Sequence, residues 1–155
     1  MQDLPTTAID FVLAFLQATL SADEKIYMEL PYGMEVPGCE RRDHVLKLKK
    51  NFYGLKKAGL NWFEYLKKGL EERGVHQSAT DLCVFYRNDA ILLTYVDNCI
   101  VLSKKSETVD EIVESLKSGI DPSNPGTKFK HKYTLTYDGG IKNYLGVEVV
   151  KRDEN

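Results

Sequence analysis

The segment Tyr95-Val96-Asp97-Asn98 places a carboxylate and an amide between two apolar, β-prone runs. These runs extend from Ile91 to Tyr95 and from Cys99 to Leu102. Two strands joined by two small polar residues predict a tight hairpin with Asp97-Asn98 at its tip. A carboxylate on such rigid backbone suits a metal site. An Asp-Asn pair is also an ordinary way to reverse a chain, because both residues tolerate the left-handed backbone conformation.

A second carboxylate, Asp10, is the only charged group in the apolar stretch from Ala8 to Leu16. An ionised side chain in such surroundings is costly unless it has a partner. Two interpretations need no metal: Asp10 caps a helix that begins near Phe11, or it faces water. If Asp10 instead ends a strand beside the hairpin tip, it converges with Asp97, and the two like charges need a cation between them. Mg²⁺ takes oxygen ligands of this kind.

Further motifs follow one another in order around these two aspartates. They are Ile9 to Leu16, Ile26 to Pro31 with Gly33 and Val36-Pro37-Gly38, Leu46 to Lys56 with Trp62, Asp81 to Phe85, Tyr95 to Asn98, and Tyr144 to Glu148. Read together, they resemble the reverse transcriptase of copia-type LTR retrotransposons. The resemblance runs from about Ala8 to Val150, and six ordered motifs are far more specific than any one of them.

The resemblance implies a catalytic role for three side chains. Asp10 would be the metal-binding aspartate of the first palm motif, and Asp97 the first aspartate of the catalytic hairpin. Asn98 occupies the position of the second hairpin aspartate. The family chemistry is RNA-directed DNA synthesis by two-metal nucleotidyl transfer, with Mg²⁺ as cofactor and Mn²⁺ as its substitute. The implied partners are an RNA template, a DNA primer, deoxynucleoside triphosphates and the remaining regions of a polyprotein.

The resemblance also assigns residues to substrate binding. Phe15 would be the aromatic steric gate under the sugar of the incoming nucleotide. Tyr53-Gly54-Leu55-Lys56 would line the template and nucleotide side of the cleft, with Gly54 allowing close backbone approach. Tyr95 is assigned to the substrate-binding set as well. Tyr144-Leu145-Gly146 would form the primer-grip hairpin.

Asn98 departs from the family pattern, which has an aspartate at this position. An amide oxygen can coordinate a hard cation, but the site loses one negative charge of three, and charge count governs affinity for such ions. We therefore expect weakened metal binding and impaired catalysis. One alternative is a degenerate, non-catalytic relic that still grips template and primer. Another is a palm-like interaction module without any nucleic-acid role, which predicts no binding to a primed template.

Length and composition agree with one soluble globular domain. The 155 residues carry 43% hydrophobic residues and a net charge of −2. We interpret residues 1–155 as a palm-centred partial domain without the upstream fingers or the downstream thumb and RNase H regions. Basic side chains gather in two stretches that could follow phosphates or simply be solvated. They are Arg41, Arg42, Lys47, Lys49, Lys50, Lys56 and Lys57, and then Lys128, Lys130, His131 and Lys132.

The three cysteines are widely spaced and form no Cys-x-x-Cys pair, which argues against a disulfide framework or a structural zinc site. The scattered histidines are interpreted as surface or packing residues. The sequence shows neither a signal peptide nor a membrane span. We therefore expect a cytoplasmic location, which the family resemblance narrows to a virus-like particle.

The elements that must position these residues follow from periodicity. Strands are expected at Thr6 to Asp10, Cys83 to Tyr86, Ala90 to Tyr95 and Cys99 to Ser103, with a short helix ending near Leu20. An amphipathic helix is expected from Lys57 to Arg73, because Trp62, Phe63, Leu66 and Leu70 recur at helical spacing, and its two aromatic residues are expected in the core. A second amphipathic helix is expected from a Ser106 cap to Gly119. A Gly- and Pro-containing connection is expected from Pro31 to Gly38, and a loop from Asp121 to Gly126. Tyr133 to Tyr137 and Tyr144 to Val150 are expected to form a hairpin around Gly139-Gly140. The predicted fold class is α+β, a polymerase palm-like antiparallel sheet packed on helices.

Overall fold

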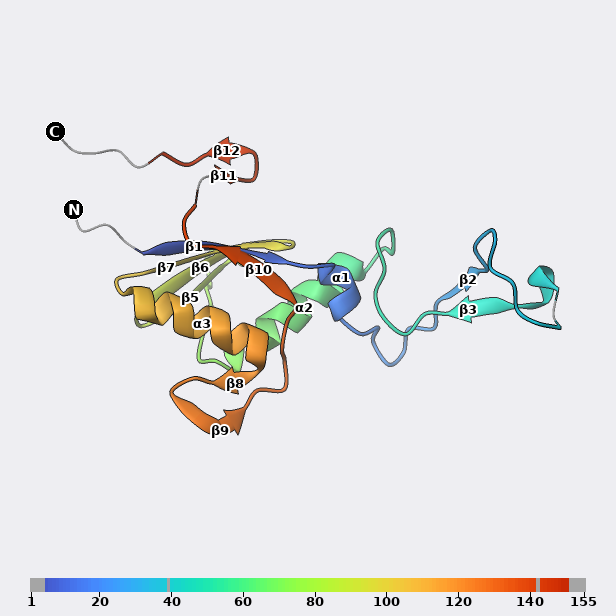
Figure 1. Ribbon diagram of the computed structural model, residues 1–155, viewed down its shortest axis with the longest axis horizontal. Coiled ribbons are helices and arrows are strands. Elements are labelled where there is room, and N and C mark those ends of the chain that lie inside the picture. The colour runs from blue at the N-terminus through green and yellow to red at the C-terminus, as the bar shows by residue number, and fades with distance from the viewer. Residues whose placement is uncertain (1–4, 39, 142, 151–155) are drawn as a thin grey trace.

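A six-stranded antiparallel sheet forms the centre of the molecule (Figure 1). The computed structural model describes residues 5–38, 40–141 and 143–150. From one edge to the other, the strands are β10 (Leu135–Asp138), β1 (Thr6–Phe11), β7 (Asn98–Ser103), β6 (Ala90–Tyr95), β5 (Val84–Arg87) and β4 (His76–Gln77). The N-terminal strand therefore lies between two strands from the second half of the chain.

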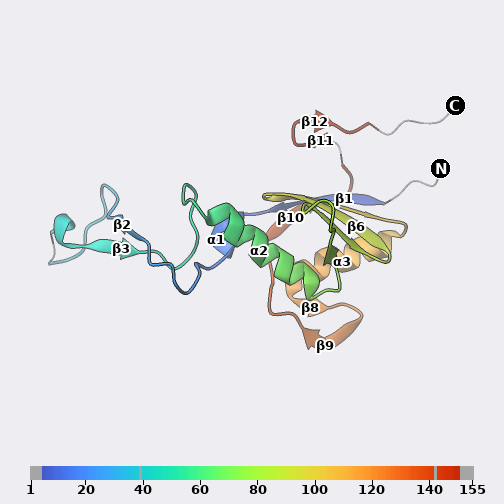
Figure 2. The ribbon, with the colours of Figure 1, turned by 180° about the vertical axis from the view of Figure 1, so that it is seen from behind.

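Helices cover one face of this sheet. The described residues form the helices α1 (Ala14–Gln17), α2 (Ala58–Glu71) and α3 (Ser106–Ser118). Both α2 and α3 lie on the same side of the sheet in Figures 1 and 2, and the small hairpin of β11 (Asn143–Tyr144) and β12 (Val147–Glu148) lies on the other side. The prediction of an α+β fold with an antiparallel sheet packed on helices is confirmed.

The core lies between the sheet and these two helices. On α2, Trp62, Leu66 and Leu70 recur at helical spacing and are all buried, as the periodicity predicted. They meet inward-facing sheet residues such as Phe11, whose ring packs edge-on against Trp62 with centroids 5.3 Å apart. The Trp62 ring also packs edge-on against that of Tyr133, at 6.0 Å. Edge-to-face packing of this kind stabilises the core beyond the contribution of the buried apolar area.

A buried guanidinium joins the two long helices. Arg73 follows α2 and donates from Nη1 to the Gly69 carbonyl at 2.6 Å, and from Nη2 to the Ser115 carbonyl at 2.7 Å. It also donates from Nη2 to the His131 carbonyl at 2.7 Å and from Nε to the Ser115 hydroxyl at 3.1 Å. Burial lowers the pKa of Arg73. The first two acceptors lie in the last turns of α2 and α3, where helix carbonyls favour a cation.

A hydrogen-bonded pair of a histidine and a glutamate lies beside this guanidinium. His131 Nδ1 is 2.7 Å from Glu72 Oε1, and the backbone N–H of His131 donates to Glu72 Oε2 at 3.1 Å. Burial raises the pKa of Glu72, but the hydrogen bonds from His131 outweigh it and hold that pKa below its ordinary value. His131 is thus a packing residue, as expected. It is buried, so it does not join the neighbouring lysines in a phosphate-binding surface.

An arm extends away from this body on the far side of α1 (Figures 1 and 2). It contains β2 (Tyr27–Glu29), the short 3₁₀ helix η1 (Arg41–Asp43) and β3 (Val45–Lys47), with Met28 paired to Leu46. The expected Gly- and Pro-containing connection from Pro31 to Gly38 lies between these two strands, whereas the strands themselves were not predicted. A two-stranded ribbon is marginally stable by itself, so its placement depends on contacts at its root.

Four expectations about local structure were wrong. Helix α1 has only four residues, and Ser106 is the first residue of α3, which has no side-chain cap. The expected loop after Gly119 forms a hairpin, β8 (Ile120–Asp121) with β9 (Asn124–Lys128). Strand β10 pairs with β1 instead of with the segment after Gly140. Only in the last case did pairing between segments far apart in sequence override a local pattern.

Cysteine chemistry follows the expectation as far as the structure describes it. Cys83 is exposed, Cys99 is buried, and both are free thiols. Burial raises the pKa of the Cys99 thiol to about 12. Cys39 lies outside the described residues. No helix among the described residues has the length and apolarity needed to cross a membrane.

We predict that Arg73→Lys lowers the free energy of unfolding by about 3 kcal/mol, because one ammonium cannot replace four guanidinium hydrogen bonds to buried acceptors. Urea denaturation followed by circular dichroism measures this loss. Arg42→Lys is the matched control, because Arg42 lies on the surface with 80% of its side chain exposed. Equal stability of the two variants would contradict the assigned role of Arg73.

Candidate metal centre and substrate-binding surface

The predicted hairpin is present, but its turn lies one residue earlier than expected. Strands β6 and β7 end in the pair Tyr95 and Asn98, so the two turn residues are Val96 and Asp97. The expectation that Asp97-Asn98 forms the tip is therefore wrong, and Asn98 is the first residue of β7. Val96 has a φ of 52°. Such left-handed backbone is unfavourable for a β-branched residue, whose side chain crowds the following carbonyl.

Asp10 lies on the strand next to this turn. It occupies the C-terminal part of β1, and its partner on β7 is Asn98. Cross-strand partners project to the same face of a sheet, and the preceding pair, Ile9 with Cys99, is buried on the helix side. Asp10 and Asn98 therefore face the side without helices. Asp10 is exposed, so the argument from a buried charge was wrong, while the proximity to the hairpin turn was foreseen.

Asn98 donates directly to the turn aspartate. Its Nδ2 lies 2.9 Å from Asp97 Oδ1. The amide thus satisfies one carboxylate oxygen of Asp97 and adds no charge to the site. An aspartate at position 98 would bring a second negative charge to the same contact, and like charges at that distance need a cation.

Two elements hold the turn backbone. The Phe11 N–H donates to the Asp97 carbonyl at 2.7 Å, which extends the β1–β7 pairing into the turn. From the helix layer, Trp62 Nε1 donates to the Val96 carbonyl at 2.6 Å. The helical spacing of Trp62 predicted its place in the core but not this bond. The polar N–H of a buried tryptophan, which needs an acceptor, was the signal that pointed to it.

The residues assigned to nucleotide binding lie on two segments that meet. Phe15 on α1 packs against Tyr53, with ring centroids 4.7 Å apart. Gly54 has a φ of 92°, a backbone conformation that favours glycine, and Lys56 is exposed. The structure thus brings the predicted steric-gate residue and the predicted cleft segment together. Tyr95 lies next to the turn, at the end of β6, and its side chain is exposed.

The three predicted primer-grip residues lie in a hairpin of their own. Tyr144 pairs with Val147, so Leu145 and Gly146 form a two-residue turn, with φ angles of 50° and 79°. Burial raises the pKa of the Tyr144 phenol. In Figure 1 this hairpin lies over the face of the sheet that carries Asp10. Its position agrees with an approach to that face, although its pairing with 133–137 was wrongly predicted.

A polar network fastens the root of the arm to α2. Asn51 is buried and donates from Nδ2 to the Ala18 carbonyl at 3.2 Å and to the Thr19 carbonyl at 3.0 Å. Asn61 on α2 donates to Asn51 Oδ1 and to Glu24 Oε2, both at 2.9 Å. These residues were not among those singled out by sequence. Asparagines within amphipathic or basic stretches carry no periodic signal, and only tertiary contacts show that they are satisfied in pairs.

The basic stretch lies largely on the arm and its root. Arg41 stacks on the Tyr32 ring at 4.0 Å, and Arg42 pairs with Glu40 at 2.6 Å. The lysines behave differently, because they are exposed and form no ion pair with any described residue, apart from Lys57 near Glu24. The four free lysines are Lys47, Lys49, Lys50 and Lys56. They supply positive charge to solvent from β3, from the chain that follows it and from the segment that carries Tyr53.

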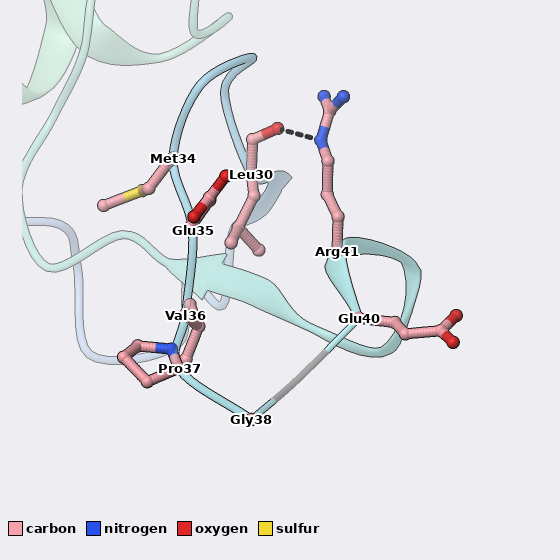
Figure 3. A pocket seen from close by; sticks show the side chains of 8 residues that line it. All are labelled: Leu30, Met34, Glu35, Val36, Pro37, Gly38, Glu40 and Arg41. Atoms are coloured by element: carbon pink, nitrogen blue, oxygen red, sulfur yellow. Dashed lines mark hydrogen bonds between the residues drawn. The ribbon is translucent and has the colours of Figure 1, made fainter.

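A cavity of about 500 Å³ lies in the arm (Figure 3). Its walls come from residues between Leu30 and Arg41, and the Arg41 Nε donates to the Leu30 carbonyl at 2.8 Å across it. None of the predicted site residues lines this cavity. It belongs to the arm and is separate from the aspartate turn.

The donor set at the turn fits a hard divalent cation. Asp10 and Asp97 contribute carboxylate oxygens from adjacent elements, and Asn98 contributes an amide oxygen, the ligand types that Mg²⁺ and Mn²⁺ accept. Among the described residues, no group of three or more acidic, histidine or cysteine side chains forms a metal site. The side chains of the turn and its partner on β1 thus offer two carboxylates and one amide.

Comparison with known proteins shows the family of this chain. Residues 2–155 match the family model described as reverse transcriptase (RNA-dependent DNA polymerase). The chain belongs to this reverse transcriptase family. It is 32% identical over 129 residues to the retrovirus-related Pol polyprotein from transposon TNT 1-94 of Nicotiana tabacum, a match that covers 80% of this chain and 9% of that polyprotein.

A yeast relative gives the same result. The chain is 31% identical over 116 residues to the transposon Ty1-DR4 Gag-Pol polyprotein of Saccharomyces cerevisiae, which covers 74% of this chain and 7% of the relative. The chain of this reverse transcriptase family member thus spans less than a tenth of either polyprotein. No solved structure matches it. The resemblance drawn from the ordered motifs is confirmed, and the α+β sheet with helices on one face is compatible with a polymerase palm.

We predict that Val96→Asn raises the free energy of unfolding by about 0.5 to 1 kcal/mol, because asparagine tolerates the left-handed backbone that strains a β-branched residue. Urea denaturation measures the change. Val147→Asn is the control, since Val147 is exposed on the extended strand β12 and gains nothing from an asparagine. The strain assigned to Val96 would be refuted if both substitutions lowered stability alike.

Proposed function

We propose that this chain is the palm segment of a copia-type retrotransposon polyprotein and takes part in RNA-directed DNA synthesis. Its substrates would be an RNA template, a DNA primer and deoxynucleoside triphosphates, and the remaining polyprotein regions would be its partners. The observation that carries the proposal is the meeting of Asp10 and the Asp97 turn on one open sheet face, in a chain of the reverse transcriptase family.

In this proposal Asp10, Asp97 and the Asn98 amide oxygen hold divalent ions. Bound Mg²⁺ would supply the positive charge that activates the primer hydroxyl and supports the leaving pyrophosphate. Phe15 would lie under the sugar of the incoming nucleotide, braced by the Tyr53 ring 4.7 Å away. Tyr95, Gly54 and Lys56 would flank the same substrate.

The Asn98–Asp97 hydrogen bond makes this a weak metal site. A cation that binds Asp97 must compete with the amide N–H for Oδ1, and it meets two negative charges where the family pattern supplies three. The fold around the site is intact, since the turn keeps its bonds to Phe11 and Trp62. The deficit is therefore one of charge, which a single substitution can restore.

We predict that Asn98→Asp increases nucleotide incorporation by the chain by at least about tenfold, because a third carboxylate adds charge to the metal site. Primer extension on an RNA template with Mg²⁺, and then with Mn²⁺, measures this. The double variant Asp97→Asn, Asn98→Asp is the matched control, since it returns the charge count to that of the original chain.

Each outcome of this experiment decides something. Activity in Asn98→Asp alone supports an intact cleft with an inactivating amide. Equal activity in the original chain shows that two aspartates and an amide suffice and refutes the predicted impairment. Failure of both proteins to incorporate nucleotides, even where they bind primed template, would contradict a catalytic role for this chain on its own.

A second function, binding of nucleic acid without catalysis, is favoured by the free lysines. Lys47, Lys49, Lys50 and Lys56 point into solvent without ion-pair partners among the described residues, while Asn98 weakens the catalytic site. Such side chains can neutralise phosphates and release counterions from nucleic acid. This function needs the basic surface and not the aspartates.

We predict that replacing Lys47, Lys49 and Lys50 together by glutamine weakens binding to a primed RNA template and flattens its salt dependence. Each lost phosphate contact reduces the slope of log affinity against log salt by about 0.7 to 0.9. Fluorescence anisotropy at several salt concentrations measures the slope. A triple variant at Lys67, Lys68 and Lys117, on the helix side of the sheet, is the control, and an equal effect of both variants would point to total charge instead of a specific surface.

A further inference from the structure

The turn that carries Asp97 is held from the helix layer by one side chain. Trp62 lies on α2 with 1% of its surface exposed, and its indole N–H donates to the Val96 carbonyl at 2.6 Å. The next carbonyl, that of Asp97, accepts from the Phe11 N–H at 2.7 Å. The two peptide groups of the turn are therefore each fixed by a donor from a different element.

The backbone conformation at Val96 needs the restraint that the Trp62 hydrogen bond supplies. A β-branched residue with a φ of 52° occupies a sparsely populated backbone region, which persists only where the surroundings hold it in place. Val96 has no buried side chain to do this, since 47% of its surface is exposed. The hydrogen bond to its carbonyl fixes the peptide plane that leads into Asp97, and this plane sets the direction in which the carboxylate leaves the backbone.

Trp62 is itself held firmly by its neighbours, so it can fix the position of the turn. Its ring packs against Phe11 and Tyr133 with centroids 5.3 Å and 6.0 Å apart. The preceding residue, Asn61, is bonded to the arm root at Asn51 and Glu24. The indole therefore cannot follow a displaced turn without moving the helix and the aromatic cluster with it.

We propose that Trp62 is a positioning residue for Asp97, and that the N–H of its indole, as well as its bulk, orients the carboxylate for a divalent cation. This inference rests on the proposed metal-binding role of Asp97. The substitution Trp62→Phe separates the hydrogen bond of the side chain from its packing, because phenylalanine keeps an aromatic ring in the core and lacks the N–H donor.

The chain contains one tryptophan, so the Trp62 indole N–H gives a single side-chain resonance in ¹⁵N-labelled protein. We would compare the full chain with Trp62→Phe and with the control Leu66→Ala, which opens the same core one helical turn away from Trp62. The readouts are the amide resonances of residues 96–98 and the affinity for Mn²⁺, with free Mn²⁺ measured by electron paramagnetic resonance.

The expected result is that Trp62→Phe shifts the 96–98 resonances and weakens Mn²⁺ binding by about two- to tenfold, which corresponds to one hydrogen bond. Leu66→Ala should lower stability and leave both readouts near those of the original chain. Unchanged turn resonances and unchanged Mn²⁺ affinity in Trp62→Phe would overturn the proposal, and so would equal effects of the control. If the original chain binds no Mn²⁺, the metal proposal fails by itself, and the turn resonances still decide whether Trp62 positions Asp97.

Discussion

The buried guanidinium of Arg73 is the contact on which the helix layer depends. Three of its four hydrogen bonds join carbonyls near the C-terminal ends of α2 and α3 to the segment that leads into β10, and the fourth goes to the Ser115 hydroxyl. Carbonyls near the C-terminal end of a helix lie at the negative end of its dipole, so a buried cation there is stabilised by them. The Ser115 carbonyl accepts from Arg73 in addition to the Gly119 N–H. Because β10 pairs with β1, the same contact also fixes the edge of the sheet beside Asp10. The arrangement of two helices under one sheet follows from this junction as much as from apolar burial.

Helix α2 connects this helix layer to the aspartate turn. The helix presents Asn61 and Trp62 in succession, one toward the root of the arm and the other toward Val96. Among the described residues of the arm, the sheet structure is a two-stranded ribbon, which depends on such root contacts for its orientation. The strained backbone at Val96 depends on α2 as well, because the surrounding packing must offset the energy of the strained conformation. One rigid helix thus serves two parts of the molecule that are far apart in sequence.

Local patterns in the sequence predicted the elements that are amphipathic or continuously apolar. Strands β6 and β7 and helix α2 have such patterns. Trp62, Leu66 and Leu70 are buried as the helical spacing predicted, whereas Phe63 is only half-buried against the core. The position of the turn was missed by one residue, because a two-residue loop of Val96 and Asp97 contradicts the usual preference of turns for small polar residues. The partner of β10 could not be predicted, since 135–138 joins β1 across more than a hundred residues of chain. The polar contacts of Arg73, Asn51 and the Trp62 indole have no periodicity and are visible only in three dimensions.

Asn98 changes the relation between the fold and a bound ion. With an aspartate at position 98, two carboxylates would meet at the turn and a third, that of Asp10, would lie on the neighbouring strand, so that the hairpin would be destabilised by repulsion until a cation bound. The amide removes one of those charges and donates to Asp97 Oδ1 at 2.9 Å. The turn then has an internal donor where the acidic version needs a metal, and this stabilises the ion-free hairpin. The hydrogen bond occupies the amide N–H of Asn98, so only its uncharged amide oxygen is left for a cation. The substitution therefore favours the folded, ion-free hairpin and weakens the cation site, a consequence of replacing one acceptor by a donor at a single position.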